Sequence, residues 1–220
     1  MYAPPACAKT DRNLLIPALS QIRFACVVFT DAGGICANHL PMLVDESDSE
    51  NLVLLAHAAR ANDIWRRAGS GVEAIAIFQG PNAYIHPGWY PSKEVAGRAV
   101  PTWDYIVVHA HGTLEAIDDT AFVRDVADRL SAAMERGFAD PWSSADAPAE
   151  YIDGLIPRIV GLRLRVKKLE GSWKIDQNKS ISDRIGLAGK LDGSPCPHHG
   201  ALSRAIKESL PSNEQPGAER

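Results

Sequence analysis

The sequence predicts an α+β protein in which an antiparallel β-barrel is covered by helices. Several strand-like segments follow one another through short turns, which is typical of antiparallel sheets. Helical segments interrupt these strands at two or three points, where they can cover the sheet. The chain has 220 residues, which is long enough for a substantial hydrophobic core.

Strands are predicted where β-branched and apolar residues run between turn residues. A hairpin turn at 31–34, with two glycines, joins the first two strands, and turns are also expected at 80–82 and 170–171. The predicted strands are Ile22–Thr30, Ile35–Val44, Leu52–Leu55, a segment ending Ile75–Phe78, Ala83–His86, Tyr105–His111 and Leu162–Leu169.

Helices are predicted from composition, caps and periodicity. A short helix over Leu14–Leu19 follows Asp11, although Pro17 weakens it. The segment HAARANDIWRR, which starts at His57, has helical composition. Asp118 or Asp119 caps a helix over Thr120–Arg136, whose apolar residues recur every four positions and which Gly137 ends. Tyr151–Ile156 forms a helical turn before a proline.

The stretch from Phe78 to Gly112 concentrates the residues that suggest a ligand. It holds two of the five tryptophans and three of the five tyrosines, together with prolines, glycines and three histidines. Aromatic rings that flank turns, with polar groups between them, suit a planar ligand with a charged tail. The alternative is that Tyr84, Trp89, Tyr90 and Trp103 only close one end of the barrel.

The corner at His57 is a candidate anion site, because a strand is expected to change there into a helix. Free backbone N–H groups at a helix start attract phosphate, and Arg60 would pair with it. His57 and Asn62 would add hydrogen bonds. The alternative is an ordinary solvated Arg60 and a capping His57.

Three further features carry alternatives of their own. Arg163, Arg165 and Lys167 share one face of a strand, which is either solvent-exposed or serves an anion. His109 and His111 share a strand face, but no third ligand of suitable spacing follows, so we interpret them as core or interface residues and predict no metal site. Residues 45–50, DESDSE, form a predicted solvated acidic loop.

Composition restricts the class of protein. A net charge of −4 and a pI near 6.0 disfavour a non-specific nucleic-acid binder. We expect neither a membrane segment nor a signal peptide. The four cysteines are scattered, as in a protein of the reducing cytoplasm. Pro, Ser, Glu and Gly accumulate from Gly193, so we predict one domain over residues 1–191 and a loosely held tail over 192–220.

Seven short motifs, in order along the chain, resemble the PaiB-type FMN-binding negative transcriptional regulators. They are MYAPP at Met1, HLPMLVD at His39, HAARAND at His57, FQGPNAYIHPGWYPSK at Phe78, VPTWDY at Val100, IVGLRL at Ile159 and GSWKIDQNKS at Gly171. The resemblance covers the chain from Met1 to about Leu191.

This resemblance implies a split β-barrel like that of pyridoxamine-phosphate oxidases and flavin reductases. It also implies a homodimer that binds FMN where the two subunits meet. The residues that the resemblance assigns to FMN are His39 and Pro41 near the ring, His57, Arg60 and Asn62 near the phosphate, Ser92, Lys93, Thr102 and Trp103 in the aromatic stretch, and Lys174, Gln177 and Asn178 in the closing segment.

The chain departs from the family pattern at two positions. Asp104 stands where the family usually carries asparagine, and Asp63 stands where it usually carries proline. Either carboxylate would oppose an anionic cofactor if it faced the site.

Three functions follow as hypotheses. The first is a dimeric FMN-binding regulator that lowers transcription, for which the sequence shows neither a readable helix-turn-helix nor a basic recognition face. The second is an FMN-dependent oxidoreductase of the flavin-reductase or pyridoxamine-phosphate-oxidase type, in which the flavin performs the redox chemistry. The third is a flavin-free barrel that acts as an interaction module. No catalytic residue stands out, so whether the protein is an enzyme stays open.

Overall fold

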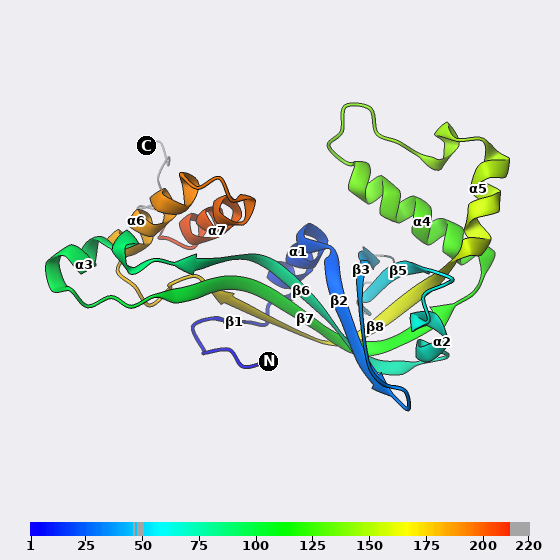
Figure 1. Ribbon diagram of the computed structural model, residues 1–220, viewed down its shortest axis with the longest axis horizontal. Coiled ribbons are helices and arrows are strands. Elements are labelled where there is room, and N and C mark those ends of the chain that lie inside the picture. Colours follow the sequence, from blue (N-terminus) through cyan, green and yellow to red (C-terminus); the bar gives the residue numbers. More distant parts are fainter. Residues whose placement is uncertain (46, 48–50, 212–220) are drawn as a thin grey trace. The chain divides into compact units, whose positions relative to one another are not determined.

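A computed structural model describes residues 1–45, 47 and 51–211, which form one eight-stranded sheet with helices (Figure 1). The strands are β1 Ala8–Lys9, β2 Phe24–Asp31, β3 Gly34–Pro41, β4 Leu43–Asp45, β5 Val53–Ala59, β6 Val72–Ile85, β7 Thr102–Ile117 and β8 Ile159–Lys174. The α-helices are α1 Arg12–Ile22, α2 Ile64–Ala68, α3 Pro91–Ala96, α4 Thr120–Glu135, α5 Ala149–Leu155, α6 Ile181–Asp192 and α7 Pro197–Glu208. Short 3₁₀ turns are η1 Pro87–Trp89, η2 Ser144–Asp146 and η3 Ile156–Arg158.

The strand order shows why the sheet curls into a barrel. Neighbouring strands follow the order β3-β2-β6-β7-β8-β5-β4, and β1 pairs with β8. The two ends of this order, β3 and β4, are consecutive in the chain with only Met42 between them. The edges of the sheet must therefore come together, yet no ladder joins β3 to β4 among the described residues. The predicted antiparallel split β-barrel with covering helices is confirmed.

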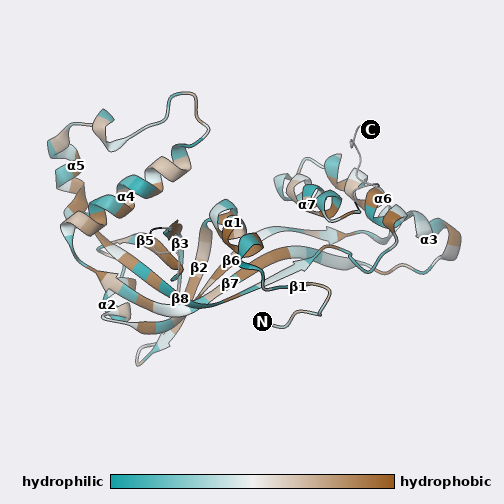
Figure 2. Ribbon diagram, turned by 180° about the vertical axis from the view of Figure 1, so that it is seen from behind, coloured by the Kyte–Doolittle hydropathy of each residue, from teal (hydrophilic) through white to brown (hydrophobic). Residues whose placement is uncertain are grey.

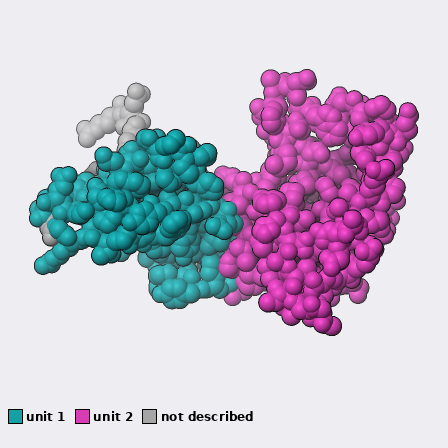
Figure 3. Space-filling view, viewed as in Figure 1, with its two compact units in different colours: residues 1–11, 79–108, 170–220 teal, residues 12–78, 109–169 magenta. Residues whose placement is uncertain are grey.

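The chain divides into two compact units, which Figure 3 shows in different colours. Unit 1 comprises residues 1–11, 79–108 and 170–220, and unit 2 comprises residues 12–78 and 109–169. The long strands β6, β7 and β8 contribute residues to both units. The predicted domain boundary after Leu191 stays a prediction.

Unit 2 holds the curled part of the sheet. The β2–β3 hairpin is confirmed, with Asp31 opposite Gly34. Along the strands of unit 2, hydrophobic residues alternate with hydrophilic ones (Figure 2). The side chains that face the core include the fully buried Val27 of β2, Leu54 of β5 and Leu164 of β8. Helix α4 begins as predicted, because the Asp119 carboxylate accepts a hydrogen bond from the Phe122 N–H.

Unit 1 is built on the remaining parts of β6, β7 and β8, with β1 beside β8. Its apolar core includes Ile85, Ile175, Leu187 and Leu202. Helix α7 packs on α6 and buries Leu202 and Ile206. The prediction of a loosely held tail is therefore wrong for α7. The composition of this segment is polar on average, but Leu202 and Ile206 lie on one face of the helix and are buried. Residues 212–220 of that predicted tail lie outside the described part of the chain, as does most of the predicted acidic loop at 45–50.

Two predicted turns are wrong, since the strands continue through them. Strand β6 runs straight through 80–82, where β2, which pairs only with Ala74–Phe78, no longer flanks it. Pro81 therefore costs no ladder hydrogen bond on that side, as is usual for proline in edge strands. Strand β8 continues through Gly171 because β1 pairs with it there, with Lys9 opposite Gly171.

None of the helices in the described ranges combines the length and the apolar character needed to cross a membrane.

Candidate functional site

In unit 2, the segment after β5 differs from the predicted strand-to-helix corner. His57 and Ala59 still pair with β8, opposite Gly161 and Ile159, and helix α2 begins only at Ile64. The backbone N–H of Arg60 donates to the Arg158 carbonyl and that of Asn62 to the Ala59 carbonyl, both at 2.8 Å. The prediction of a helix N-terminus at His57 is therefore wrong, because strand pairing with β8 overrides the helical composition of the segment 57–67.

Arg60 lies in this turn with its guanidinium already paired. Its Nη1 donates to Asp118 Oδ2 at 2.7 Å, its Nη2 to Asp118 Oδ1 at 2.5 Å and its Nε to the Pro157 carbonyl at 2.7 Å. The hydrogen bond to Asp118 raises the pKa of Arg60. The two side chains are 35% and 52% exposed, and ion pairs of such exposure contribute little to stability. A phosphate at Arg60 would therefore have to compete with Asp118 for the guanidinium.

The other two residues of the predicted phosphate group lie in the same segment. Asn62 Nδ2 donates to Asn38 Oδ1 at 2.7 Å, and Asn62 Oδ1 accepts from the Ile64 N–H at 3.0 Å. His57 Nδ1 is buried and has no hydrogen-bond partner among the described residues. Burial lowers the pKa of His57 and so favours the neutral ring. Of the three predicted phosphate contacts, His57 therefore has a buried polar atom without a described partner, whereas Arg60 and Asn62 would have to exchange their present partners for a phosphate.

His39 and Pro41 lie on the opposite face of β3 from Asn38. Cys26 is opposite His39 and Phe24 is opposite Pro41, so these side chains share the outer face of the sheet. The His39 ring stacks on Phe24, with centroids 5.9 Å apart. The structure thus places the predicted ring contacts on an aromatic outer surface and Asn62 toward the other side of β3.

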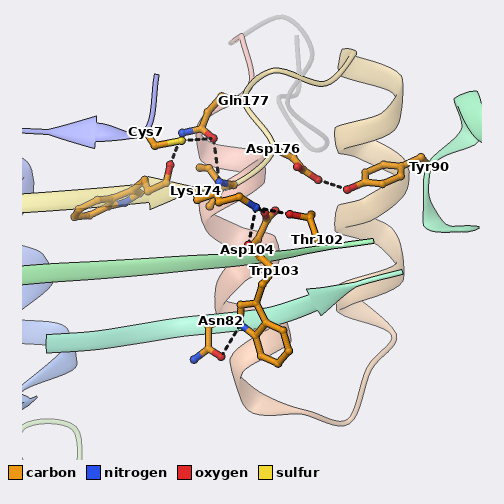
Figure 4. Close-up of polar contacts among 11 residues, drawn as sticks. Cys7, Asn82, Tyr90, Thr102, Trp103, Asp104, Lys174, Asp176 and Gln177 are labelled. Carbon is orange, nitrogen blue, oxygen red and sulfur yellow. Dashed lines mark hydrogen bonds and ion pairs between the residues drawn. The ribbon is translucent and has the colours of Figure 1, made fainter. Parts of the chain in front are cut away.

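The remaining predicted residues belong to unit 1, where Lys174 is the central group (Figure 4). Its ammonium donates to Thr102 Oγ1 and to the Trp103 carbonyl, both at 2.6 Å, and to Asp104 Oδ1 at 3.0 Å. An ammonium has three donors, so the Lys174 donors are all used in tying β8 to the start of β7. The Trp103 ring points away from this group and donates to Asn82 Oδ1 at 3.1 Å.

Gln177 and Ser92 also have partners inside unit 1. Gln177 Nε2 donates to the Ala6 carbonyl at 3.2 Å and to the Trp173 carbonyl, and its Oε1 accepts from the Ile175 N–H at 3.0 Å. Ser92 Oγ donates to Asp183 Oδ2 at 2.8 Å. Lys93 and Asn178 are exposed, so their polar ends face solvent.

A buried pair of carboxyl groups, those of Asp104 and Asp176, lies near Lys174, and the sequence did not reveal that these residues come together. Asp104 is fully buried, and its Oδ2 has no hydrogen-bond partner in the described part of the chain. The Tyr90 hydroxyl donates to Asp176 Oδ2 at 2.5 Å. Burial and the nearby Asp176 raise the pKa of Asp104 to about 7, against the opposing effect of Lys174. Asp104 therefore does not present its carboxylate to solvent.

Unit 2 also contains the basic face of β8 and the two histidines of β7 that the sequence singled out. Arg163 and Arg165 both pair with Glu115, and Lys167 pairs with Glu73, so each cation on the basic face of β8 has a carboxylate partner. The rings of His109 and His111 lie 6.1 Å apart on β7. No group of three or more His, Cys, Asp or Glu residues able to hold a metal ion occurs in residues 1–45, 47 and 51–211.

Known proteins resemble both the sequence and this fold. Residues 1–168 match the family described as "Putative FMN-binding domain". The chain is 24% identical over 210 residues to Protease synthase and sporulation protein PAI 2 of Bacillus subtilis, which covers 96% of this chain and 98% of that protein.

Two of the solved structures that share the fold are named as cofactor-binding proteins. The FAD and heme binding protein of Mycobacterium smegmatis has a TM-score of 0.57 at 16% identity and covers 76% of this chain and 73% of its own. The flavocytochrome Anf3 of Azotobacter vinelandii has a TM-score of 0.53 at 12% identity and covers 76% of this chain and 69% of its own.

Proposed function

The chain belongs to the family of PaiB-type FMN-binding domains, and from this premise we propose that it is a homodimeric flavoprotein that binds FMN and lowers transcription of target genes. The observation that carries the proposal is the family match over residues 1–168, which contain all of unit 2 except its last residue, Leu169. The regulatory role rests on the motifs shared with PaiB-type regulators and on 24% identity to one bacterial relative.

The residues of unit 2 fit the phosphate end of FMN. Arg60, Asn62 and His57 lie within six residues of one another and supply cationic, amide and imidazole groups. The buried His57 Nδ1, which has no described partner, would gain one from a ligand or a water molecule bound beside the His57 ring. Bound FMN would supply a redox-active ring, while these side chains bind and orient its phosphate.

The outer face of β2, β3 and β6 supports the proposed dimer. Phe24 is 57% exposed and Ile35 is 77% exposed on this face. Ile77 lies opposite Cys26, and Ile75 lies opposite Val28, so apolar side chains continue across the three strands. Contiguous exposed apolar surface is typical of protein–protein interfaces. His39 and Pro41 belong to the same face and would therefore lie at the proposed dimer interface.

Flavin titration of the purified protein tests the proposal. FMN is expected to bind with micromolar affinity or better. Riboflavin is expected to bind more weakly, because it lacks the phosphate that His57, Arg60 and Asn62 would contact. A protein that binds neither flavin would contradict the proposal and favour the interaction module.

Two further assays separate the regulator from the oxidoreductase. The regulator is expected to lower expression from a target promoter, read as a reporter signal or a gel shift, with FMN bound. Rapid NAD(P)H oxidation by the FMN-loaded protein, without any effect on transcription, would favour the flavin-reductase type of enzyme.

A further inference from the structure

Unit 1 contains an acid pair, Asp104 of β7 and Asp176 of the turn after β8, that the flavin proposal does not use. Both residues are buried. Asp104 Oδ1 accepts from Lys174 at 3.0 Å, whereas Asp104 Oδ2 has no hydrogen-bond partner in the described part of the chain. A buried carboxylate oxygen without a donor is costly, but the same oxygen can carry a proton. The surroundings of Asp104 therefore favour its protonated form.

Asp176 is held in place by its backbone and by its side chain. Its φ is +56°, in the left-handed region that few residues other than glycine adopt. Its carboxylate accepts from the Tyr90 hydroxyl at 2.5 Å (Figure 4), and its carbonyl accepts from the Lys179 N–H at 3.0 Å. The Asp176 carboxylate cannot turn away from Asp104 without breaking the bond to Tyr90.

Charged groups of both signs surround the acid pair. The titratable groups near it in unit 1 are Lys174 in β8, Lys179 in the turn, Tyr90 before α3, and Asp183 and Arg184 in α6. Burial and the charge of Asp176 raise the pKa of Asp104 to about 7, although Lys174 and Lys179 act in the opposite direction. The two lysines therefore do not offset burial and the second carboxylate.

We propose that the acid pair is a proton-dependent latch, which holds the turn 175–180 against β7 while Asp104 carries a proton and releases the turn when that proton leaves. With the proton on Asp104 Oδ2, the pair has one negative charge, on Asp176. Without it, two buried carboxylates repel each other, and opening of the turn lets water reach both. Each opening of the latch thus releases one proton to the solvent.

The latch controls two of the predicted flavin contacts. Lys174 donates to Asp104, and Gln177 lies in the turn, where its Nε2 donates to the Ala6 and Trp173 carbonyls. An open turn breaks these bonds of Gln177 and frees its amide for a ligand. This consequence rests on the proposed function, whereas the latch itself does not.

The pH range of the latch follows from the two states of Asp104. In the open turn Asp104 is solvated and has its ordinary pKa of 3.8, whereas in the closed turn its pKa is about 7. Between these values the closed state holds a proton that the open state has released, so opening becomes about tenfold more favourable per pH unit. Above this range both states are ionised, and opening no longer depends on Asp104.

Amide hydrogen exchange of the full chain, measured by mass spectrometry at several pH values, tests the latch. The reporters are peptides that contain Ile175 and Lys179, whose N–H groups are bonded within the turn. Dividing the exchange rate of wild type by that of Asp104→Asn at the same pH removes the intrinsic effect of pH on exchange. This ratio is expected to rise about tenfold per pH unit from pH 5 to pH 7 and then to level off.

Two further variants accompany Asp104→Asn. Asp176→Asn keeps an oxygen that accepts from Tyr90, and asparagine tolerates the left-handed backbone. In this variant the rise should end at a lower pH, because Asp104 loses the nearby charge. Asp192→Asn is the matched control, since Asp192 is a carboxylate of α6 that pairs with Lys207, which lowers its pKa. It should exchange like wild type.

The latch would be overturned if wild type and Asp104→Asn exchanged the turn amides with the same pH dependence. It would also be overturned if Asp192→Asn abolished the rise. An equal rise in the amides of α4, in unit 2, would report unfolding of the whole chain and would likewise contradict a local latch. Because exchange is measured without flavin, a protein that binds no FMN would contradict the proposed function and leave the latch unaffected.

Discussion

Asp104 is the residue at which burial and charge conflict most directly. Its carboxyl group is fully buried on β7, and its pKa is raised from 3.8 to about 7. Between these two values the unfolded chain has released the proton and the folded protein still holds it. The free energy of unfolding therefore falls as the pH rises from about 4 to about 7.

Asp104→Asn is expected to remove this pH dependence, because an amide cannot ionise. At pH 8 the variant should melt roughly 2–4 °C above wild type, the shift that about 1 kcal/mol produces in a chain of this size. At pH 5 the difference should be smaller. Thermal unfolding of both proteins at the two pH values measures this, and an equal difference at both would show that Asp104 does not titrate in the folded state.

Arg60 carries the second prediction at the residue scale. Arg60→Ala is expected to weaken FMN binding about tenfold to hundredfold and riboflavin binding much less, because only FMN has the phosphate. The melting temperature should change little, since the Arg60–Asp118 pair is exposed. Fluorescence titration with both flavins measures the two affinities.

Arg66→Ala is the matched control for Arg60→Ala. The Cζ atom of Arg60 lies 5.5 Å from the Trp65 ring centroid, and that of Arg66 lies 4.5 Å from it, but Arg66 is exposed and lies beyond the turn. It should bind FMN like wild type. Equal losses of FMN and riboflavin in Arg60→Ala would move the phosphate to another cation, with the exposed Lys93 as the next candidate.

Among the elements, β7 and β8 depend on a close backbone approach at Gly112. A Cβ atom at this position would collide with the Arg165 carbonyl of β8. Gly112→Ala is therefore expected to lower the free energy of unfolding by roughly 3 kcal/mol or more.

Gly154→Ala is the control for this prediction. Gly154 lies in α5, and a Cβ atom added there would meet no atom within 4 Å, so alanine should stabilise the helix by up to about 1 kcal/mol. Chemical denaturation of both variants measures the two changes. A Gly112→Ala variant as stable as wild type would mean that the two strands can separate without cost.

The lengths of the elements were harder to predict than their kinds. Proline and glycine at 80–82 have the composition of a turn, and nothing local reveals that this part of β6 is an edge. Likewise HAARAND has helical composition, but its first residues pair with β8 about a hundred positions away. Local sequence records propensity, whereas the pairing partner decides whether a strand continues.

For the whole molecule, we expect a homodimer that forms through the outer face of β2, β3 and β6. Light scattering at micromolar concentration should give twice the monomer mass of 23.8 kDa. Phe24→Glu should give a folded monomer, because Phe24 is 57% exposed and charge there opposes burial in an interface. Val95→Glu changes an apolar residue that is 91% exposed in unit 1 and should stay dimeric. A monomeric wild type would contradict this assembly.

Motif order and strand composition were enough, by themselves, to predict the split barrel and the FMN-binding family, because both depend on short local patterns spread over most of the chain. The tertiary structure alone decided which polar groups are already occupied. Lys174 and Gln177 resemble ligand contacts in sequence, yet their donors bind Thr102, Asp104 and backbone carbonyls. A hydrogen-bonding side chain has few donors, and only the fold determines whether chain or ligand receives them.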